Sequence, residues 1–137
     1  MVDLKSTTYF LGRWQQLGAE PTIICDSGHN QAGIQQILQQ LEKMPYGQLH
    51  FVLGMVNDKD IDKILKMLPT NARYYFVKAD IPRGLAADIL KTKAAAFNLK
   101  GRKYSAVKNG LKAAKRRAEK KDLIFVGGST FVVAEVV

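Results

Sequence analysis

The sequence has little of the chemistry from which disulfide-bonded, metal-binding or membrane-spanning proteins are built. It contains one cysteine, which excludes an internal disulfide and favours the reducing cytoplasm. That residue, Cys25, lies in an apolar run, where we expect a buried and unreactive thiol. The two histidines, His29 and His50, are not spaced as a ligand pair, so no metal site is predicted. No apolar run approaches the roughly 20 residues that cross a bilayer, and the first residues do not resemble a signal peptide.

Motifs for nucleotide hydrolysis and for serine hydrolases are also missing. Neither the GxGxxG fingerprint nor the GxxxxGK[ST] P-loop occurs in the chain. A triad of Ser129, His29 and Asp26 is disfavoured, because the serine follows two glycines and lacks the GxSxG elbow. With 137 residues, of which 47% are hydrophobic, the chain suits one globular domain with a substantial core.

Positive charge is what the sequence has in excess, with a formal net charge of +9. Residues 100–121 hold ten Lys or Arg residues against one acid, Glu119. A nucleic-acid partner, an anionic substrate or an acidic neighbouring domain would each fit this excess. Apart from Tyr104, the stretch has no aromatic residue on which bases stack. We therefore interpret it as the solvated face of a helix and expect any nucleic-acid binding to be weak and non-specific.

Short β-branched segments alternate along the chain with segments of helical period, which is the pattern of βαβ units. Strands are predicted at residues 22–25, 49–53, 74–77, 102–104 and 123–126, and helices at about 34–41, 61–68, 85–97 and 107–114. In the 85–97 helix, Ile89, Leu90 and Ala94 are expected to pack on the sheet. The predicted fold class is α/β, a three-layer domain around a mostly parallel sheet of about six strands.

The two ends of this pattern are less regular. An edge strand within residues 12–17 is expected to be antiparallel if residues 18–21 form a tight turn. The alternation of strands and helices favours a final helix after Ser129, whereas the β propensity of residues 131–137 favours a strand.

Polar residues gather in the loops that follow the predicted parallel strands. These loops are residues 26–31, 54–60, 78–84 and 127–130. In an open parallel sheet, ligands bind beyond the carboxyl ends of the strands, which all lie at one edge. The sequence therefore predicts a functional rim at that edge.

The first of these loops places Asp26, His29 and Asn30 between a strand and the start of a helix. Asp26 is suited to accept hydrogen bonds from a sugar hydroxyl or to hold a cationic group. His29, near the positive end of the helix, is suited to bind a carboxylate or to orient a phosphate. Alternatively, Asp26 and Asn30 only satisfy the turn and cap the helix, and the pattern leaves both interpretations open.

The other loops carry weaker signals. Asp60 precedes a helix and is expected to cap it. Arg83 can face an anion, although a lone loop arginine is more often solvated. The two glycines before Ser129 have the composition of an anion nest, but the turn is too short to be specific.

Taken in order, these loops resemble the carboxy-terminal domain of folylpolyglutamate synthase and of its bifunctional form with dihydrofolate synthase, relatives of the Mur ligases. The matching residues span residues 12–137 and are Gly12-Arg13-Trp14-Gln15, Asp26-Ser27-Gly28-His29-Asn30, Gly54-Met55, Asp58-Lys59-Asp60, Pro82-Arg83, Gly128-Ser129 and Ala134-Glu135. Ser27-Gly28 replaces the Gly-Ala of the family form, and Gln31 stands where the family has proline.

The resemblance implies a Rossmann-like domain with one antiparallel edge strand, facing a P-loop ATPase domain across a cleft. In this family, ATP phosphorylates a carboxylate of folate or dihydropteroate, and the amine of L-glutamate attacks the acyl phosphate. The resemblance places Mg²⁺ and the P-loop in the ATPase domain. Residues 1–137 would then be a single domain, with residues 1–11 a possible linker remnant, and we expect the isolated chain to be an inactive monomer.

Site residues follow from the same resemblance, position by position. Arg13 and Asp26 would contact ATP, and His29 and Ser129 would lie at the glutamate pocket. The supporting loop residues would be Asn30, Lys59, Asp60 and Arg83.

Three other interpretations remain open. The chain could be the same domain of a cell-wall Mur ligase, although the Gly12-Arg13-Trp14-Gln15 and Gly128-Ser129 motifs favour the folate branch. It could also be a basic α/β module that binds nucleic acid, or a purely structural domain. Whether the parent enzyme acts on dihydropteroate, on folate or on both does not follow from this sequence.

Overall fold

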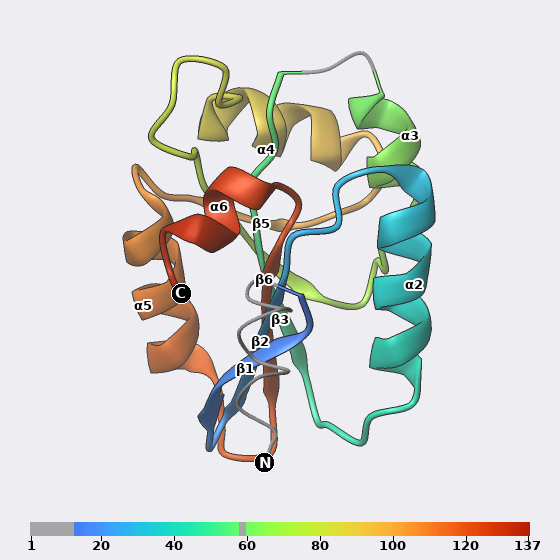
Figure 1. The fold of residues 1–137 in the computed structure, drawn as a ribbon, viewed down its shortest axis with the longest axis vertical. Helices are drawn as coiled ribbons and strands as arrows, with labels where there is room; N and C mark the ends of the chain where they lie inside the picture. The colour runs from blue at the N-terminus through green and yellow to red at the C-terminus, as the bar shows by residue number, and fades with distance from the viewer. Residues whose placement is uncertain (1–12, 58–59) are drawn as a thin grey trace.

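The computed structural model describes residues 13–57 and 60–137, which form one six-stranded sheet with helices on both faces (Figure 1). In chain order the elements are β1 (Gln15–Ala19), β2 (Thr22–Asp26), α2 (Gln31–Glu42), β3 (Leu49–Leu53), α3 (Ile61–Met67), β4 (Arg73–Phe76), α4 (Ala87–Ala95), β5 (Gly101–Lys103), α5 (Val107–Arg117), β6 (Leu123–Gly127) and α6 (Thr130–Ala134). The predicted linker remnant 1–11, Gly12 and residues 58–59 lie outside the described residues.

The sheet is parallel except at one edge. Its strand order is β1-β2-β6-β3-β4-β5, in which β1 runs antiparallel to β2 and every other neighbouring pair is parallel. Ala19 pairs with Thr22, so a two-residue turn joins β1 to β2, as the antiparallel prediction requires. The predicted fold class, a mostly parallel sheet with one antiparallel edge strand, is confirmed.

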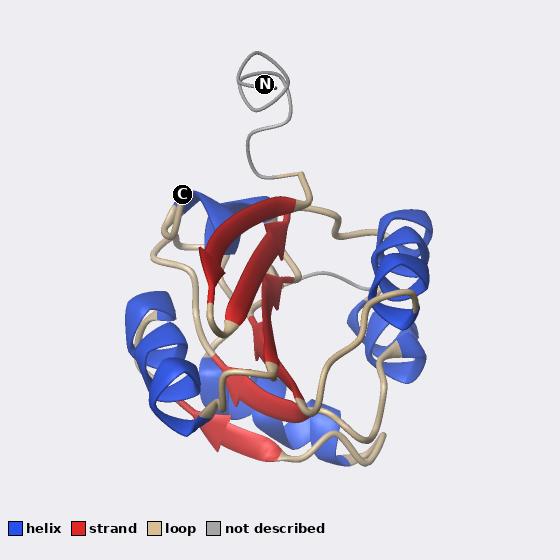
Figure 2. Ribbon diagram, turned by 90° about the horizontal axis from the view of Figure 1, so that it is seen from below, coloured by secondary structure: helices blue, strands red, loops and turns tan. Residues whose placement is uncertain are grey.

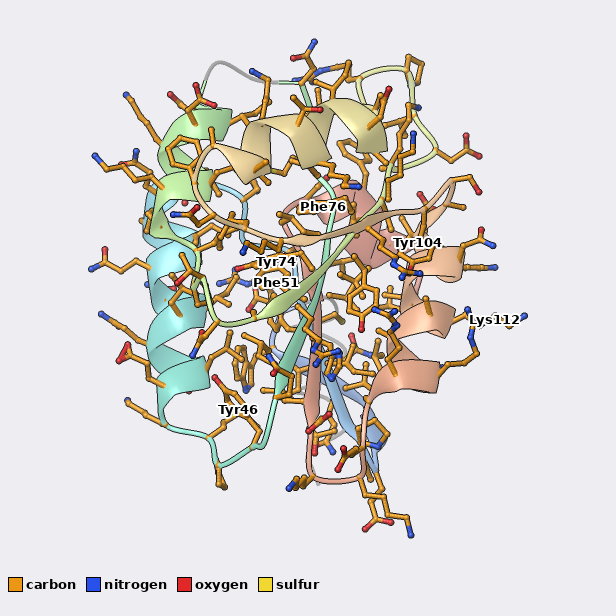
Figure 3. All side chains as sticks on the ribbon, turned by 180° about the vertical axis from the view of Figure 1, so that it is seen from behind. Tyr46, Phe51, Tyr74, Phe76, Tyr104 and Lys112 are labelled. Atoms are coloured by element: carbon orange, nitrogen blue, oxygen red, sulfur yellow. The ribbon has the colours of Figure 1, made fainter. Side chains whose placement is uncertain are left out.

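Two hydrophobic layers cover the sheet, because alternate side chains of a strand point to opposite faces. In β3, Phe51 and Leu53 belong to the layer that includes α2, α3 and α4, whereas Val52 belongs to the layer that includes α5 and α6. Figure 2, which looks at the sheet from below, shows helices on both sides of it. In the first layer Tyr74 stacks between Phe51 and Phe76, with ring centroids 5.5 and 5.8 Å apart (Figure 3).

Polar side chains define where two of the helices begin. The Asn30 Oδ1 atom accepts a hydrogen bond from Gly33 N at 2.8 Å and caps α2. The Ser129 Oγ atom accepts from Phe131 N at 3.1 Å and caps α6. The final segment is therefore a short helix, which buries Val132 and Val133 against the sheet despite its β propensity.

Two local predictions were wrong. The helix predicted at about 85–97 is present as Ala87–Ala95, but Ile89 is 47% exposed while Leu90 and Ala94 are buried. Leu90 and Ala94, four residues apart, form the packed stripe, and Ile89 lies about 100° around the helix from Leu90. Asp60 takes the N-cap position of α3, but its side chain makes no capping hydrogen bond within the described residues.

The basic stretch is largely a solvated face, as predicted. Within α5, Val107, Ala113 and Ala114 are buried against the sheet, whereas the lysines and arginines are exposed. Lys112 points away from the sheet in Figure 3. Across residues 13–57 and 60–137, no helix combines the length and apolar character that a membrane span needs.

A buried polar network, which no pattern in the sequence indicated, closes the amino edge of the sheet. His50 Nε2 lies 2.9 Å from Asp122 Oδ2, and His50 Nδ1 lies 2.8 Å from the Tyr75 hydroxyl. The same carboxylate accepts hydrogen bonds from Gln48 N at 3.0 Å and from Glu119 N at 2.9 Å. Asp122 therefore joins the start of β3, the turn after α5 and the start of β6.

We predict that this network makes the stability of the domain depend on acid pH. Burial alone would raise the pKa of Asp122, but hydrogen bonds from Glu119 N, His50 and Gln48 N lower it overall. The ionised Asp122 carboxylate therefore contributes its full share of the folding stability above the unfolded-state pKa of about 4. This stability is lost as the pH falls through the lower pKa of the folded state. The D122N substitution should reduce the free energy of unfolding at pH 7 by about 2 kcal/mol and weaken the acid dependence. Urea unfolding at pH 7 and pH 3 measures both, and the exposed-site variant D80N, which should match the wild type, is the control.

We also predict that Cys25 is chemically silent in the folded chain. Burial, and then the neighbouring charge of Asp26, raise the pKa of its thiol to about 11. The thiol is therefore protonated at pH 7 and inaccessible to reagents. Iodoacetamide should label the native chain at least about 100-fold more slowly than the urea-unfolded chain. Equal rates in the two states would contradict this assignment.

Candidate functional site

The carboxyl edge of the sheet, at the top of Figure 1, brings the predicted rim loops together. In the strand register Asp26, the last residue of β2, pairs with Gly127 of β6, and Gly127 pairs with Leu53 of β3. Val77 N donates to the Leu53 carbonyl oxygen at 2.9 Å, so the loop after β4 starts beside them. The prediction of one polar edge is confirmed by this register.

Glycines allow two of these loops to approach each other closely. Gly128 has φ of +103°, in the left-handed region that favours glycine, and a Cβ atom there would lie 2.4 Å from the Gly54 carbonyl oxygen. A Cβ atom on Gly54 would lie 2.6 Å from the Val132 side chain, and Gly54 N donates to the Gly127 carbonyl oxygen at 3.2 Å. The loop after β3 therefore packs directly on the turn that leads into α6.

Asp26 is the most highly connected polar group of the rim. Its carboxylate is buried and accepts hydrogen bonds from Trp14 N at 3.0 Å and from Gly28 N at 2.8 Å. Arg13 Nε lies 3.4 Å from Asp26 Oδ1, while the arginine side chain remains 55% exposed. Two predicted nucleotide ligands, Arg13 and Asp26, are therefore in contact, and the arginine is accessible to a ligand.

His29 and Asn30 occupy the start of α2, beside this carboxylate loop. His29 is exposed, and its Nδ1 atom lies 3.3 Å from the Ser27 carbonyl oxygen. Asn30 uses its side-chain oxygen to cap α2, so the structural interpretation of that residue is confirmed. His29 and Asn30 are both exposed, but the Asn30 side-chain oxygen is already engaged in the helix cap.

Ser129 lies at the start of α6 and is 2% exposed. Its Oγ atom is engaged as the acceptor of the helix cap described above. The neighbouring Phe131 is 45% exposed at the same edge. Contact between the Ser129 hydroxyl and a ligand therefore requires a small local opening at the first turn of α6.

Two of the predicted supporting residues, Asp60 and Arg83, lie on the part of the rim formed by the loops after β3 and β4, whereas Asn30 lies beside the Asp26 loop. Asn57 N donates to the Arg83 carbonyl oxygen at 2.8 Å, and Val56 forms a β-bridge with Gly84, so the loops after β3 and β4 are joined. The Arg83 side chain is exposed, and Asp60 Oδ1 lies 3.8 Å from Lys63 Nζ. The loop after β3 starts two strand spacings from β2, about 10 Å, and the loop after β4 starts three spacings away, about 14 Å. Lys59 lies outside the described residues.

One hydrogen bond at the rim, between the end of α6 and the loop after β4, was not predicted from the sequence. Glu135 Oε2 accepts a hydrogen bond from Asp80 N at 2.8 Å and ties the end of α6 to the loop after β4. The sequence feature that pointed to Glu135 was its place in the Ala134-Glu135 motif, which follows Ser129. The contact stabilises the relative position of two rim loops.

The exposed side chains of the rim are suited to bind an anion. The rim presents the exposed side chains of Arg13 and His29, which are groups that stabilise negative charge by position. Among residues 13–57 and 60–137, no three His, Cys, Asp or Glu residues form a group that could hold a metal ion. A groove of about 440 Å³ lies at the opposite, amino edge, between residues 44–47 and 120–123, away from this chemistry.

Comparison with known proteins identifies the family. The model of the Mur ligase glutamate ligase domain matches residues 12–130. The chain is 36% identical, over 90% of its length, to a probable bifunctional folylpolyglutamate synthase/dihydropteroate synthase of Haloferax volcanii. It is 29% identical, over 91% of its length, to the dihydrofolate synthase/folylpolyglutamate synthase of Escherichia coli. The chain spans 15% and 29% of these two relatives.

Solved structures agree with the sequence relatives. Escherichia coli FolC in complex with DHPP and ADP superposes with a TM-score of 0.83 at 29% identity, over 91% of this chain and 30% of that one. Bifunctional folylpolyglutamate synthase/dihydrofolate synthase of Yersinia pestis gives a TM-score of 0.80 at 30% identity, with the same coverage. The sequence match, the fold and the rim motifs therefore agree, and the chain belongs to the Mur ligase family as a glutamate ligase domain of the folylpolyglutamate synthase/dihydrofolate synthase type.

Proposed function

We propose that this chain is the carboxy-terminal domain of an ATP-dependent ligase that adds L-glutamate to folate or dihydropteroate. The observation that carries the proposal is the Arg13–Asp26 contact on a rim whose loops carry the family's motifs in order. Solved relatives were crystallised with DHPP and ADP, and with Mn, AMPPNP and L-glutamate, which supports the same ligand classes.

In this proposal each rim residue has a role that its surroundings permit. Arg13 and Asp26 contact ATP, with the exposed guanidinium facing phosphate oxygens and the carboxylate accepting from a hydroxyl. His29, exposed at the start of α2, and Ser129 contact the L-glutamate substrate. Asn30, Lys59, Asp60 and Arg83 support the loops around them.

ATP supplies the phosphate that activates the substrate carboxylate, and the amine of glutamate then displaces it. The residues of this domain act by orienting the two substrates and by stabilising negative charge. The described residues lack a metal-binding group of their own, so we assign Mg²⁺ and the P-loop to an amino-terminal ATPase domain. The chain spans about 30% of its solved relatives, a fraction that suits this division.

A cell-wall Mur ligase is the alternative, and the comparisons favour the folate branch. The two relatives named above and both solved neighbours carry folate-branch names. The basic face of α5 would serve a nucleic-acid-binding module instead, but the motifs cluster at the rim and not on that helix.

We predict that the 137-residue chain alone has no ligase activity, because the phosphate-binding loop and the metal site are assigned to the other domain. Incubation with ATP, Mg²⁺, L-glutamate and either dihydropteroate or folate should give no glutamylated product by mass spectrometry. Measurable ATP-dependent product from the purified chain would contradict the division of labour.

We predict that Arg13 and Asp26 act on the nucleotide in the full-length protein. The R13A and D26N substitutions should each lower kcat/KM for ATP on the order of 100-fold, because R13A removes a cationic contact to the phosphate oxygens and D26N removes the carboxylate charge that faces a hydroxyl and holds Arg13. R116A, which removes an exposed arginine of α5, should leave it unchanged. If R13A and R116A behave alike, Arg13 is not a nucleotide ligand. If the wild-type protein does not glutamylate either substrate, the proposed reaction is wrong.

A further inference from the structure

Trp14 has an unusual backbone for a bulky residue. Its φ is +46°, in the left-handed region, and Asn98 is the other non-glycine residue with positive φ in the described part of the chain. Asparagine adopts this region readily, whereas an aromatic residue does so only where its surroundings impose it. A strained position of this kind next to a predicted ligand, Arg13, calls for a physical cause.

Two contacts hold Trp14 in this conformation. Its indole packs on the core layer of α2, α3 and α4, with its centroid 6.0 Å from that of Phe125 in the central strand β6. Its backbone N–H donates to Asp26 Oδ2 at 3.0 Å. The side chain is therefore fixed from within the domain, while the backbone is fixed by the carboxylate at the rim.

The consequence of this bend is visible in the strand register. Gln15 pairs with Cys25, so an extended β1 would continue with Trp14 opposite Asp26 as another backbone pair. The bend instead aims the Trp14 N–H at the Asp26 side chain and sets Arg13 Nε 3.4 Å from the same carboxylate. The other carboxylate oxygen, Asp26 Oδ1, accepts a hydrogen bond from Gly28 N at 2.8 Å.

We propose that Trp14 is the positioning residue of the nucleotide pocket: its anchored indole maintains the left-handed bend that orients Asp26 and Arg13 before the nucleotide binds. This inference rests on the proposed function, because it takes Arg13 and Asp26 as the nucleotide ligands. Trp14 itself need not touch the nucleotide. The bend restricts the orientations of Arg13 and Asp26 before the nucleotide binds. Without it, binding itself would have to restrict them.

Two substitutions at Trp14 separate the effect of the indole from the effect of the backbone conformation. Trp14→Gly keeps free access to positive φ but removes the indole, whereas Trp14→Phe keeps an aromatic anchor. Tyr46→Ala is the matched control, because Tyr46 is also a half-buried aromatic on the same core layer but lies beside the groove at the amino edge. A merely structural role of Trp14 would make Trp14→Gly and Tyr46→Ala equivalent.

In the full-length protein, Trp14→Gly should raise KM for ATP on the order of tenfold with kcat retained within about twofold, since a binding geometry is lost and not a reacting group. Trp14→Phe should restore the wild-type KM, and Tyr46→Ala should not change it. An unchanged KM in Trp14→Gly, or an equal rise in Tyr46→Ala, would overturn the proposal.

Amide hydrogen exchange on the 137-residue chain provides a readout that does not depend on activity. The residue-14 amide should exchange at least about tenfold faster in Trp14→Gly than in the wild type, and at the wild-type rate in Trp14→Phe. The Gln48 amide, bonded to Asp122, reports that the rest of the domain is intact. If the wild-type enzyme lacks ligase activity, the proposed function fails while this exchange experiment still decides the role of Trp14. Retained protection of residue 14 in Trp14→Gly would show that the indole is not the anchor.

Discussion

The parallel pairing of β6 between β2 and β3 is the constraint on which the rest of the domain depends. Because Asp26, Gly127 and Leu53 are in register, three loops leave the sheet side by side. The close approach of Gly128 to Gly54 then becomes unavoidable, and glycine at both positions accommodates it. The polar rim is thus a result of strand order, to which the individual loops add their side chains.

The two edges of the sheet use polar groups in opposite ways. At the amino edge His50, Tyr75 and Asp122 are buried and satisfy one another, which suits a fixed structural junction. At the carboxyl edge Asp26 and Ser129 are buried and accept hydrogen bonds from the chain itself, but Arg13 and His29 are exposed. This difference in accessibility, more than the residue types, distinguishes a binding edge from a structural one.

Periodicity predicted the strands and most helices because each packed face repeats within a short stretch of sequence. It misplaced Ile89, because Ile89 and Leu90 lie about 100° apart around the helix and the sequence alone did not show which of them would be buried. The His50 network was missed because its partners lie 25 and 72 residues away, beyond any local pattern. At the rim, topology predicted that the loops share one edge, which the strand register confirms, whereas the residues that the family resemblance assigns to ligands stay predictions. The bend at Trp14 is set by tertiary contacts with Phe125 and Asp26, so no local signal could reveal it.

The position of β6 also bears on how the domain is made. The last strand in the sequence is near the centre of the sheet and is the strand that joins β1 and β2 to β3, β4 and β5. During synthesis from the amino terminus, these two groups of strands cannot be joined before β6 is made. Until then each group has an exposed edge. Loss of the segment from Leu123 onward would leave no bridging strand between them. The domain can consequently acquire its rim only after nearly all of its chain has been translated.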